Sequence, residues 1–390
     1  INLGEKEFER ALLQQIDDEG NYSQHSAIYH RMMLQLALLY DARNRRLKRE
    51  MPAAIKRKLE LAARWLAAQL DPLSGRLPNL GHNDGTLLLP FGSEEYRDMR
   101  PTAQAAALAF CGAPCLPSGK WDDLAAWLGL QSSENREVIQ LSSPAVHKVG
   151  SGSTWGSLRG VTFHGRPAHC DQLHVDLWWQ GINIARDAGT YRYNAPEPWQ
   201  NSLDRTRIHN TITIGDLDQM ERVSRFLWLD QAQAHWLPVE EENKVKASQD
   251  GYRKLGVLHT RTLQFTQPDG FLVTDEITPL SKEPANHRAV LHWLLPDWDW
   301  HVEGNAITLV HGGQQVNLTV KALDGESHTV TPIDLSIIRG GQTLHGNGTD
   351  NLLGWESDTY AEKTPALSFS VTCELTTSLT LLSTWELNRD

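Results

Sequence analysis

The feature that most constrains the fold is a change of hydrophobic period near residue 140. Before it, apolar residues recur at helical spacing, as in EKEFERALLQQI, SAIYHRMMLQLALLYDARN and PAAIKRKLELAARWLAAQL. After it, short runs alternate apolar and polar residues between turn formers, as in LHVDLWW, TITI, FLVTDEI and LSFSVTC. This order predicts a helical domain over 1–140 and an antiparallel β-sandwich over 141–390.

The same periodicity predicts which side of two helices is buried. Each predicted stripe contains four apolar residues that share one helix face. The stripes are Ile28, Met32, Leu36 and Leu39 in the helix around 26–44, and Ile55, Leu59, Ala62 and Leu66 in the helix that follows Pro52.

Composition excludes some classes of function. The net charge of −11 argues against general nucleic-acid binding, although a small anionic ligand needs only a local basic pocket. No apolar run reaches the roughly 18–20 residues of a membrane-spanning helix. The four cysteines have no zinc-finger spacing, and CGAPC is compatible with a disulfide or with two thiols. Because the chain begins without Met inside a helical pattern, we expect an upstream portion to be missing.

Two polar clusters in the helical part are candidates for a site. In GNYSQHSAIYHR, His25 lies in a turn and Tyr29 opens a helix, where a side chain can face a cleft. On spacing alone, packing between helices is the favoured explanation of Tyr29. In LPNLGHNDGTLLLPFGSEEYRDMRP, His82 and Asn83 suit hydrogen bonds to sugar hydroxyls or a carboxylate, and Arg97 suits a carboxylate. A turn capped by its own side chains is the alternative.

A third cluster stands at the start of the predicted sandwich, in HGRPAHCDQLHVDLW. A hairpin through WQG brings Asp187 back toward His169, and His209 begins a further strand. Two histidines and one carboxylate are a ligand set that zinc accepts. A buried hydrogen-bonded polar cluster without metal is the alternative.

At these residues the sequence resembles the heparinase II/III-like polysaccharide lyases. RPAHCDQLHVDLWWQGINIARDAGTYRYN and RTRIHNTITIGDLDQ are similar to the family's His-rich, DPGTY-like and HNT-like segments. DDEGNYSQHSAIYH is similar to an upstream family segment that ends in Tyr-His.

The resemblance implies part of an (α/α) toroid followed by an antiparallel β-sandwich. It implies cleavage of a uronate-containing polysaccharide by β-elimination, with Tyr29 as the catalytic acid and base. It also implies a structural divalent metal, with Zn²⁺ as the expected ion, held by His169, Asp187 and His209. An acidic glycan is the expected partner, and a periplasmic or secreted location is expected for an enzyme that acts on external glycans.

Two departures from the family pattern qualify this hypothesis. Pro167 stands where many relatives carry a catalytic His, so His164 is the nearest substitute, assisted by His25. The family's Asn-bearing segment upstream of the Tyr segment has no counterpart before Tyr29. We expect Tyr191 to contribute to the sugar groove from the sandwich side.

Two other functions compete with the lyase. A non-catalytic glycan-binding or exopolysaccharide-assembly protein would keep the fold without the chemistry, as Pro167 suggests. Glycoside hydrolysis needs a carboxylate pair, and although Asp84 and Asp171 are available, nothing in the sequence pairs them. The sequence leaves open which polysaccharide is cut, whether cleavage is endo or exo, the oligomeric state and the identity of the metal.

Overall fold

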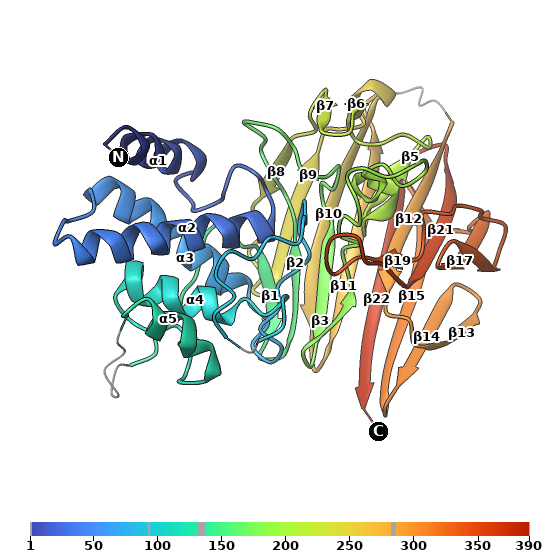
Figure 1. Cartoon of the computed structure of the whole chain (residues 1–390). Coiled ribbons are helices and arrows are strands. Elements are labelled where there is room, and N and C mark those ends of the chain that lie inside the picture. The colour runs from blue at the N-terminus through green and yellow to red at the C-terminus, as the bar shows by residue number, and fades with distance from the viewer. Residues whose placement is uncertain (1, 93, 131–136, 282–285, 390) are drawn as a thin grey trace. The chain divides into compact units, whose positions relative to one another are not determined.

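The computed structural model of the chain describes residues 2–92, 94–130, 137–281 and 286–389. The chain divides into two compact units, Ile1–Val146 and His147–Asp390 (Figure 1). The first is helical and the second consists almost entirely of antiparallel strands. The helical and alternating patterns of the sequence therefore belong to different units.

The helical unit is built from five α-helices among its described residues. Their bounds are α1 Asn2–Gln15, α2 Ala27–Arg46, α3 Ala53–Gln69, α4 Arg100–Ala106 and α5 Asp123–Trp127. A π-helical turn, Ala107–Cys111, extends α4. The hydroxyl oxygen of Ser26 accepts a hydrogen bond from the backbone N–H of Tyr29, and this side-chain cap starts α2.

The buried side of α3 is as predicted, but that of α2 is not. Ile55, Leu59, Ala62 and Leu66 are all at most 1% exposed, whereas Leu36 and Leu39 are 39% and 44% exposed. The polar residues His30, Arg31 and Gln35 are buried instead. His30 bonds to the carbonyl of Ala62, and Arg31 donates to the carbonyls of Tyr96 and Thr86. Because these polar groups have partners, they can occupy the buried side of α2.

The β unit contains three larger sheets. A nine-stranded sheet has the order β13-β14-β15-β22-β11-β10-β9-β8, with β16 paired to β15. Its strands are β8 Ala234–Leu237, β9 Lys244–Gln249, β10 Val257–Thr266, β11 Gly270–Pro279, β13 Asp299–Glu303, β14 Ala306–His311, β15 Gln314–Asp324, β16 Thr329–Val330 and β22 Leu379–Arg389.

The other two sheets are shorter. The four-stranded sheet β1-β2-β3-β4 contains Lys148–Ser151, Thr154–Leu158, Val175–Trp179 and Ile182–Ala185. The five-stranded sheet β18-β17-β21-β12-β5 contains Gln342–His345, Asp334–Arg339, Leu367–Leu375, His287–Leu295 and Ile212–Ile214. Two small hairpins are β6 Glu221–Ser224 with β7 Leu227–Leu229, and β19 Trp355–Glu356 with β20 Thr364–Pro365.

One continuous apolar core joins the three larger sheets, as expected for a sandwich. Leu177 comes from the four-stranded sheet, Trp293 from the five-stranded sheet and Trp385 from the nine-stranded sheet. The rings of Trp293 and Trp385 pack edge to face with centroids 5.0 Å apart. The buried side chains of these sheets fix the strand ends that carry the polar cluster.

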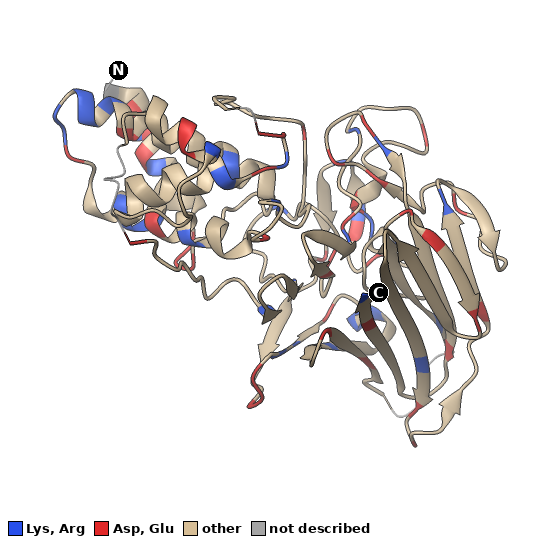
Figure 2. Cartoon of the chain, turned by 90° about the horizontal axis from the view of Figure 1, so that it is seen from below, with Lys and Arg blue, Asp and Glu red and all other residues tan. Residues whose placement is uncertain are grey.

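Three sequence expectations concern the chain as a whole. An α/α toroid is not evident among the described residues. None of the described helices combines the length and apolarity needed to cross a bilayer. All four cysteines are free thiols, including both members of CGAPC. Figure 2 shows acidic and basic residues interspersed in each unit.

Candidate functional site

The β3–β4 hairpin brings Asp187 back toward the start of β3. Gln180 and Gly181 form a two-residue turn with φ values of 53° and 81°, a conformation that matches the twist of the flanking strands. Trp179 pairs with Ile182 directly beside the turn. Asp187 therefore emerges at the end of the hairpin where residues 169–174 enter, and the predicted hairpin is confirmed.

His209 is brought to the same place by the segment before β5. Its neighbour Asn210 accepts a backbone bond from Val175, the first residue of β3. The amide of Asn210 donates to the carbonyls of Val175, at 2.8 Å, and Arg186, at 3.1 Å. Its side-chain oxygen accepts from the N–H of Leu294 at 2.6 Å. This one side chain ties the positions next to His209 and Asp187 to two strands.

The side chains of His169, Asp187 and His209 converge in a fully buried group. Each can offer one ligand atom within 4.8 Å of the others. The Nδ1 of His209 lies 3.4 Å from Oδ2 of Asp187, and the Nδ1 of His169 lies 4.0 Å from the same oxygen. All three side chains are 0% exposed. The structure thus brings together the three residues that the sequence nominated as metal ligands.

The donor set fits a zinc ion. Ligand atoms about 2.0–2.1 Å from a tetrahedral zinc lie roughly 3.4 Å apart, close to the separations in this group. The Oδ1 of Asp187 accepts from the N–H of Gly189 at 2.8 Å, which leaves Oδ2 facing the histidines. Among the described residues, that oxygen faces only the two histidines, and the ring nitrogens of His209 have no hydrogen-bond partner other than Asp187. Such buried polar atoms are costly unless another group binds them.

Electrostatics keep the carboxylate of this group charged. Burial alone would raise the pKa of Asp187, but the adjacent His209 and His169 outweigh it and lower that pKa well below its usual value. Burial lowers the pKa of His169 to about 4, so this imidazole is neutral near neutral pH. Burial alone would lower the pKa of His209, but Asp187 raises it above its usual value, so this imidazole must lose its proton before it can bind a metal ion beside the charged carboxylate.

The other acidic and histidine side chains of this stretch pair with neighbours. The Nε2 of His174 lies 3.2 Å from the carboxylate of Asp176, and its Nδ1 accepts from the N–H of Asn210. Asp171 lies 2.7 Å from the Nε of Arg159. His174 and Asp171 therefore surround the candidate ligands without joining them.

A buried ion pair in the nine-stranded sheet supports the same strand ends. Arg261 in β10 stands opposite Asp275 in β11, and the guanidinium donates to both carboxylate oxygens at 2.6 and 2.9 Å. It also donates to the carbonyls of Leu173 and Asn210. His259 bonds to the same carboxylate at 2.7 Å. The segments that carry the candidate ligands thus rest on a charged, fully buried platform.

In the helical unit, the predicted residues gather around the start of α2. The backbone N–H of Ala27 donates to the carbonyl of Leu80, and the hydroxyl of Ser26 donates to the carbonyl of His82. Gly81 has a φ of 67°, and a Cβ there would lie 2.2 Å from the carbonyl oxygen of His25. Only glycine permits this close approach of the two loops.

Tyr29 lies at the centre of this arrangement. Its half-buried hydroxyl donates to Oδ2 of Asp84 at 3.2 Å. The side-chain oxygen of Asn83 accepts from the hydroxyl of Tyr96 at 2.7 Å. His82 is buried in the same loop. The structure therefore joins Tyr29 to Asp84 and Tyr96 to Asn83, and His82 precedes Asn83 in that loop.

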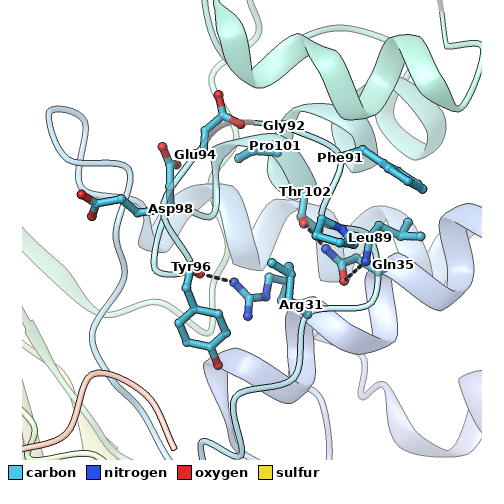
Figure 3. Close-up of a pocket in the computed structure, with 13 residues that line it drawn as sticks. Arg31, Gln35, Leu89, Phe91, Gly92, Glu94, Tyr96, Asp98, Pro101 and Thr102 are labelled. Carbon is cyan, nitrogen blue, oxygen red and sulfur yellow. Dashed lines mark hydrogen bonds between the residues drawn. The ribbon is translucent and has the colours of Figure 1, made fainter. Parts of the chain in front are cut away.

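Arg97 is buried rather than open to solvent. It is 7% exposed, and its guanidinium donates to the carbonyl of Leu77 at 2.9 Å. Figure 3 shows a neighbouring pocket lined by Arg31, Gln35, Tyr96 and Thr102. Its volume of about 60 Å³ is enough for a few water molecules.

The remaining predicted residues lie in the β unit. His164 is exposed in the segment between β2 and β3, and Pro167 is buried. Tyr191 is half-buried, and its ring packs edge to face against that of Trp199 with centroids 5.4 Å apart. No ionisable side chain therefore occupies position 167, two residues before His169.

Sequence reasoning missed several supporting residues. Asp84 was considered only for hydrolysis, and Tyr96 and Asn210 were not considered. Asn210 follows His209 in the HNT motif, which is the signal that could have identified it. Nothing in the sequence indicated Arg261 with Asp275, because their pairing depends on strand register.

Comparison with known proteins places these features in context. Residues 156–372 match the family model described as heparinase II/III-like, C-terminal. The chain is similar in structure to a heparinase III gene product (TM-score 0.70, 15% identity, 99% of this chain and 55% of the other). It is also similar to the heparan sulfate lyase HepC from Pedobacter heparinus (TM-score 0.69, 18% identity, 98% and 55%). A heparinase III crystal structure gives a TM-score of 0.70 at 13% identity, covering 100% and 57%.

The chain spans about half the length of these solved structures. At these identities the likeness shows the fold, including the β-sandwich. The comparison with curated proteins gives no match.

Proposed function

Because the chain belongs to the heparinase II/III-like family, we propose that it is a polysaccharide lyase that cleaves an acidic, uronate-containing glycan by β-elimination. The observation that carries the proposal is the position of Tyr29. Its hydroxyl donates to Asp84, which follows His82 and Asn83 in one loop, and its backbone N–H donates to Ser26 at the capped start of α2. A phenol with polar neighbours of this kind suits proton transfer on a sugar.

In β-elimination the bond between C5 and its proton breaks and the bond between C4 and the glycosidic oxygen breaks. A C4–C5 double bond forms, the base takes the C5 proton, and the departing oxygen receives a proton. We assign both transfers to Tyr29, with His25 of the same unit as a second proton carrier. Groups of this kind contribute on the order of 10²–10⁴ in rate.

The C5 proton is acidic only when the charge of the adjacent carboxylate is neutralised. We assign this task to His82 and Asn83, whose side chains donate hydrogen bonds, with Arg97 as a nearby positive charge. Asp84 orients the hydroxyl of Tyr29 through the bond that joins them. Within the β unit, Tyr191 is our candidate for sugar contact.

We further propose that His169, Asp187 and His209 hold a structural Zn²⁺. The ion would supply the positive charge that links the β3 entry, the β4 exit and the start of β5. The fit of the ligand distances and the buried oxygen of Asp187 support this role. The proton transfers assigned above use none of these three residues.

Two further proposals concern the architecture of the helical unit and the location of the protein. We propose that the helical unit, whose helices share one apolar core, is part of an α/α toroid. We propose a periplasmic or secreted location, because large acidic glycans are encountered outside the cytoplasm. Cell fractionation with a specific antibody tests the location.

The test of the lyase is the formation of unsaturated uronate, which absorbs in the ultraviolet. Acidic glycans of different uronate and sulfate content are incubated with the protein and with Tyr29→Phe, which keeps the ring but removes the hydroxyl. We expect absorbance to rise with at least one glycan and the variant to be slower by about 10²–10⁴. Equal rates would remove Tyr29 from catalysis.

The second candidate is a glycan-binding protein without lyase activity. The buried Pro167 favours it, because the position of a histidine in many relatives carries no proton donor here. Binding of acidic glycans without any unsaturated product across the whole set would establish this alternative. Reducing ends without unsaturation would instead indicate hydrolysis.

A further inference from the structure

A second cluster in the β unit surrounds one ammonium group with three aromatic rings. The Nζ of Lys363 lies 2.9 Å from the ring centroid of Trp355, 4.4 Å from that of Trp199 and 5.7 Å from that of Tyr191. The rings of Trp199 and Trp355 are nearly perpendicular, with centroids 5.9 Å apart. All four side chains are half-buried and keep exposed area. The cluster is therefore accessible to a ligand.

The backbone holds this cluster in a fixed geometry. Tyr191 has a φ of 64°, which is costly for a residue with a bulky side chain. Its N–H donates to the hydroxyl of Ser357, and its carbonyl accepts from the N–H of Ala361. The N–H of Ser357 donates to the carbonyl of Ala188. Conformations of this kind persist where neighbours enforce them, often at ligand-binding sites.

Among the described residues, no ion pair neutralises the charge of Lys363. Two acids of the 350–356 segment have other partners. Glu356 pairs with Arg186, and Asp350 pairs with Arg207. Burial also lowers the pKa of Lys363. A half-buried cation without a carboxylate is suited to receive an anion from a ligand.

The chemistry of the four side chains is complementary to one kind of sugar. An indole face packs on the C–H face of a sugar ring, which is apolar. An ammonium donates up to three hydrogen bonds to a carboxylate or a sulfate. The two groups together recognise a sugar that carries an anionic substituent. A neutral sugar would use only the rings.

We propose that Tyr191, Trp199, Trp355 and Lys363 form a binding subsite for one acidic sugar unit. Lys363 pairs with the anionic substituent, and the indoles of Trp199 and Trp355 support the ring. Tyr191 follows Asp187 by four residues. The first residue of the cluster therefore lies in the loop that follows the candidate metal group. This inference rests on the proposed function only in the class of glycan that it assigns to the subsite.

The alternative is that Lys363 has a structural role and stabilises the packing of the β19–β20 hairpin against the 188–199 segment. Both roles use the same contacts in the free protein. They differ when a glycan is added. Loss of a structural role lowers folding stability, whereas loss of a subsite lowers the affinity for acidic sugars. Binding and stability must therefore be measured together.

The test uses the whole chain with Tyr29→Phe, so that bound glycan is not cleaved. Three tetrasaccharides are titrated calorimetrically: a heparan sulfate fragment, its desulfated form and neutral cellotetraose. We expect Lys363→Met to weaken binding of at least one acidic tetrasaccharide by about 10- to 100-fold. Lys363→Arg should largely restore it. The acidic ligand that loses affinity tells whether a carboxylate suffices or a sulfate is needed.

Lys321→Met is the matched control, because Lys321 is exposed on β15 and its replacement changes the net charge equally. It should alter affinity by less than about twofold. The thermal midpoint and the binding of cellotetraose should be the same in both variants. If Lys363→Met binds acidic glycans like the control, or loses thermal stability and all glycan binding together, the subsite is disproved.

The outcome separates this inference from the lyase proposal. Acidic-glycan binding that depends on Lys363, without any unsaturated product from the unmodified protein, keeps the subsite and rejects the lyase. Unsaturated product with binding independent of Lys363 does the reverse.

Discussion

The two candidate groups of this protein are held in different ways. In the β unit, His169, Asp187 and His209 are fully buried, and the adjoining backbone is fixed by Asn210 and by the pair of Arg261 and Asp275. In the helical unit, Tyr29 and its neighbours are carried by loops and by the first turn of α2.

The two groups differ in how firmly their side chains are positioned and in how much of them is exposed to a ligand. Charges buried in a low-dielectric interior interact strongly but must be fully paired, so removing one partner is costly. In the helical unit, Tyr29 and Asp84 keep exposed area, whereas His82, Asn83 and Arg97 are buried. We therefore expect substitutions in the β group to affect stability and metal content first, and those around α2 to affect turnover first.

The largest effect on stability is expected for His209→Ala. It leaves the charge of Asp187 buried with one fewer partner, which should lower the free energy of unfolding by about 3–5 kcal/mol. Elemental analysis should show loss of bound zinc. His235→Ala, at an exposed histidine of β8, should change neither quantity. A His209→Ala protein with full metal and full stability would refute the metal assignment.

The next effect concerns Asn210→Ala. Its amide makes three hydrogen bonds to buried backbone groups, and their loss should destabilise the protein by about 3 kcal/mol. Because the ligands lose their support, zinc affinity should fall roughly 10- to 100-fold. Urea unfolding and competition with a zinc chelator measure the two effects. Asn317→Ala in β15 is the control, and an equal loss of zinc affinity there would contradict a specific role for Asn210.

Acid should weaken the helical unit through His30. Burial lowers the pKa of His30 to about 4 from its usual 6.5, so between these values the unfolded chain binds more protons. Stability is therefore present above about pH 6.5 and falls with decreasing pH, by about 2 kcal/mol between pH 7 and pH 5. His30→Gln, which can still donate to the carbonyl of Ala62, should remove this part of the pH dependence. The same slope in the variant would exclude His30 as its source.

The smallest effect is expected for Ser26→Ala. Loss of the cap and of the bond to the carbonyl of His82 should cost about 1 kcal/mol, because a helix cap contributes about that much. Helical circular dichroism during unfolding measures it. Ser26→Thr should retain most of the stability. Zinc content should be unchanged in both, and a loss of zinc would show that the two groups are not independent.

Much of the fold follows from sequence periodicity. The change from helical to alternating spacing separates the two kinds of structure, and the stripe of α3 is buried as predicted. The stripe of α2 was wrong because the burial of Arg31 and Gln35 depends on partners in residues 86–102, far along the chain. Hydropathy does not encode such long-range hydrogen bonds.

The site was predictable to a different degree in each unit. Spacing alone nominated His169, Asp187 and His209 but left a metal and a plain polar cluster as alternatives. Family resemblance favoured the metal. The platform of Arg261 and Asp275 was not predictable, because a strand pattern gives the face of a residue but not its partner across the sheet.

Gly81 shows how much can depend on a missing methyl group. The loop that carries His82 and Asn83 approaches the chain before α2 until no room remains for even the smallest side chain. The methyl group of an alanine at position 81 would displace the loop from the phenol of Tyr29, although every polar group would remain. The position of His82 and Asn83 relative to Tyr29 therefore depends on the lack of a Cβ at residue 81. Chemistry that requires contact among these three side chains tolerates no substitution of Gly81.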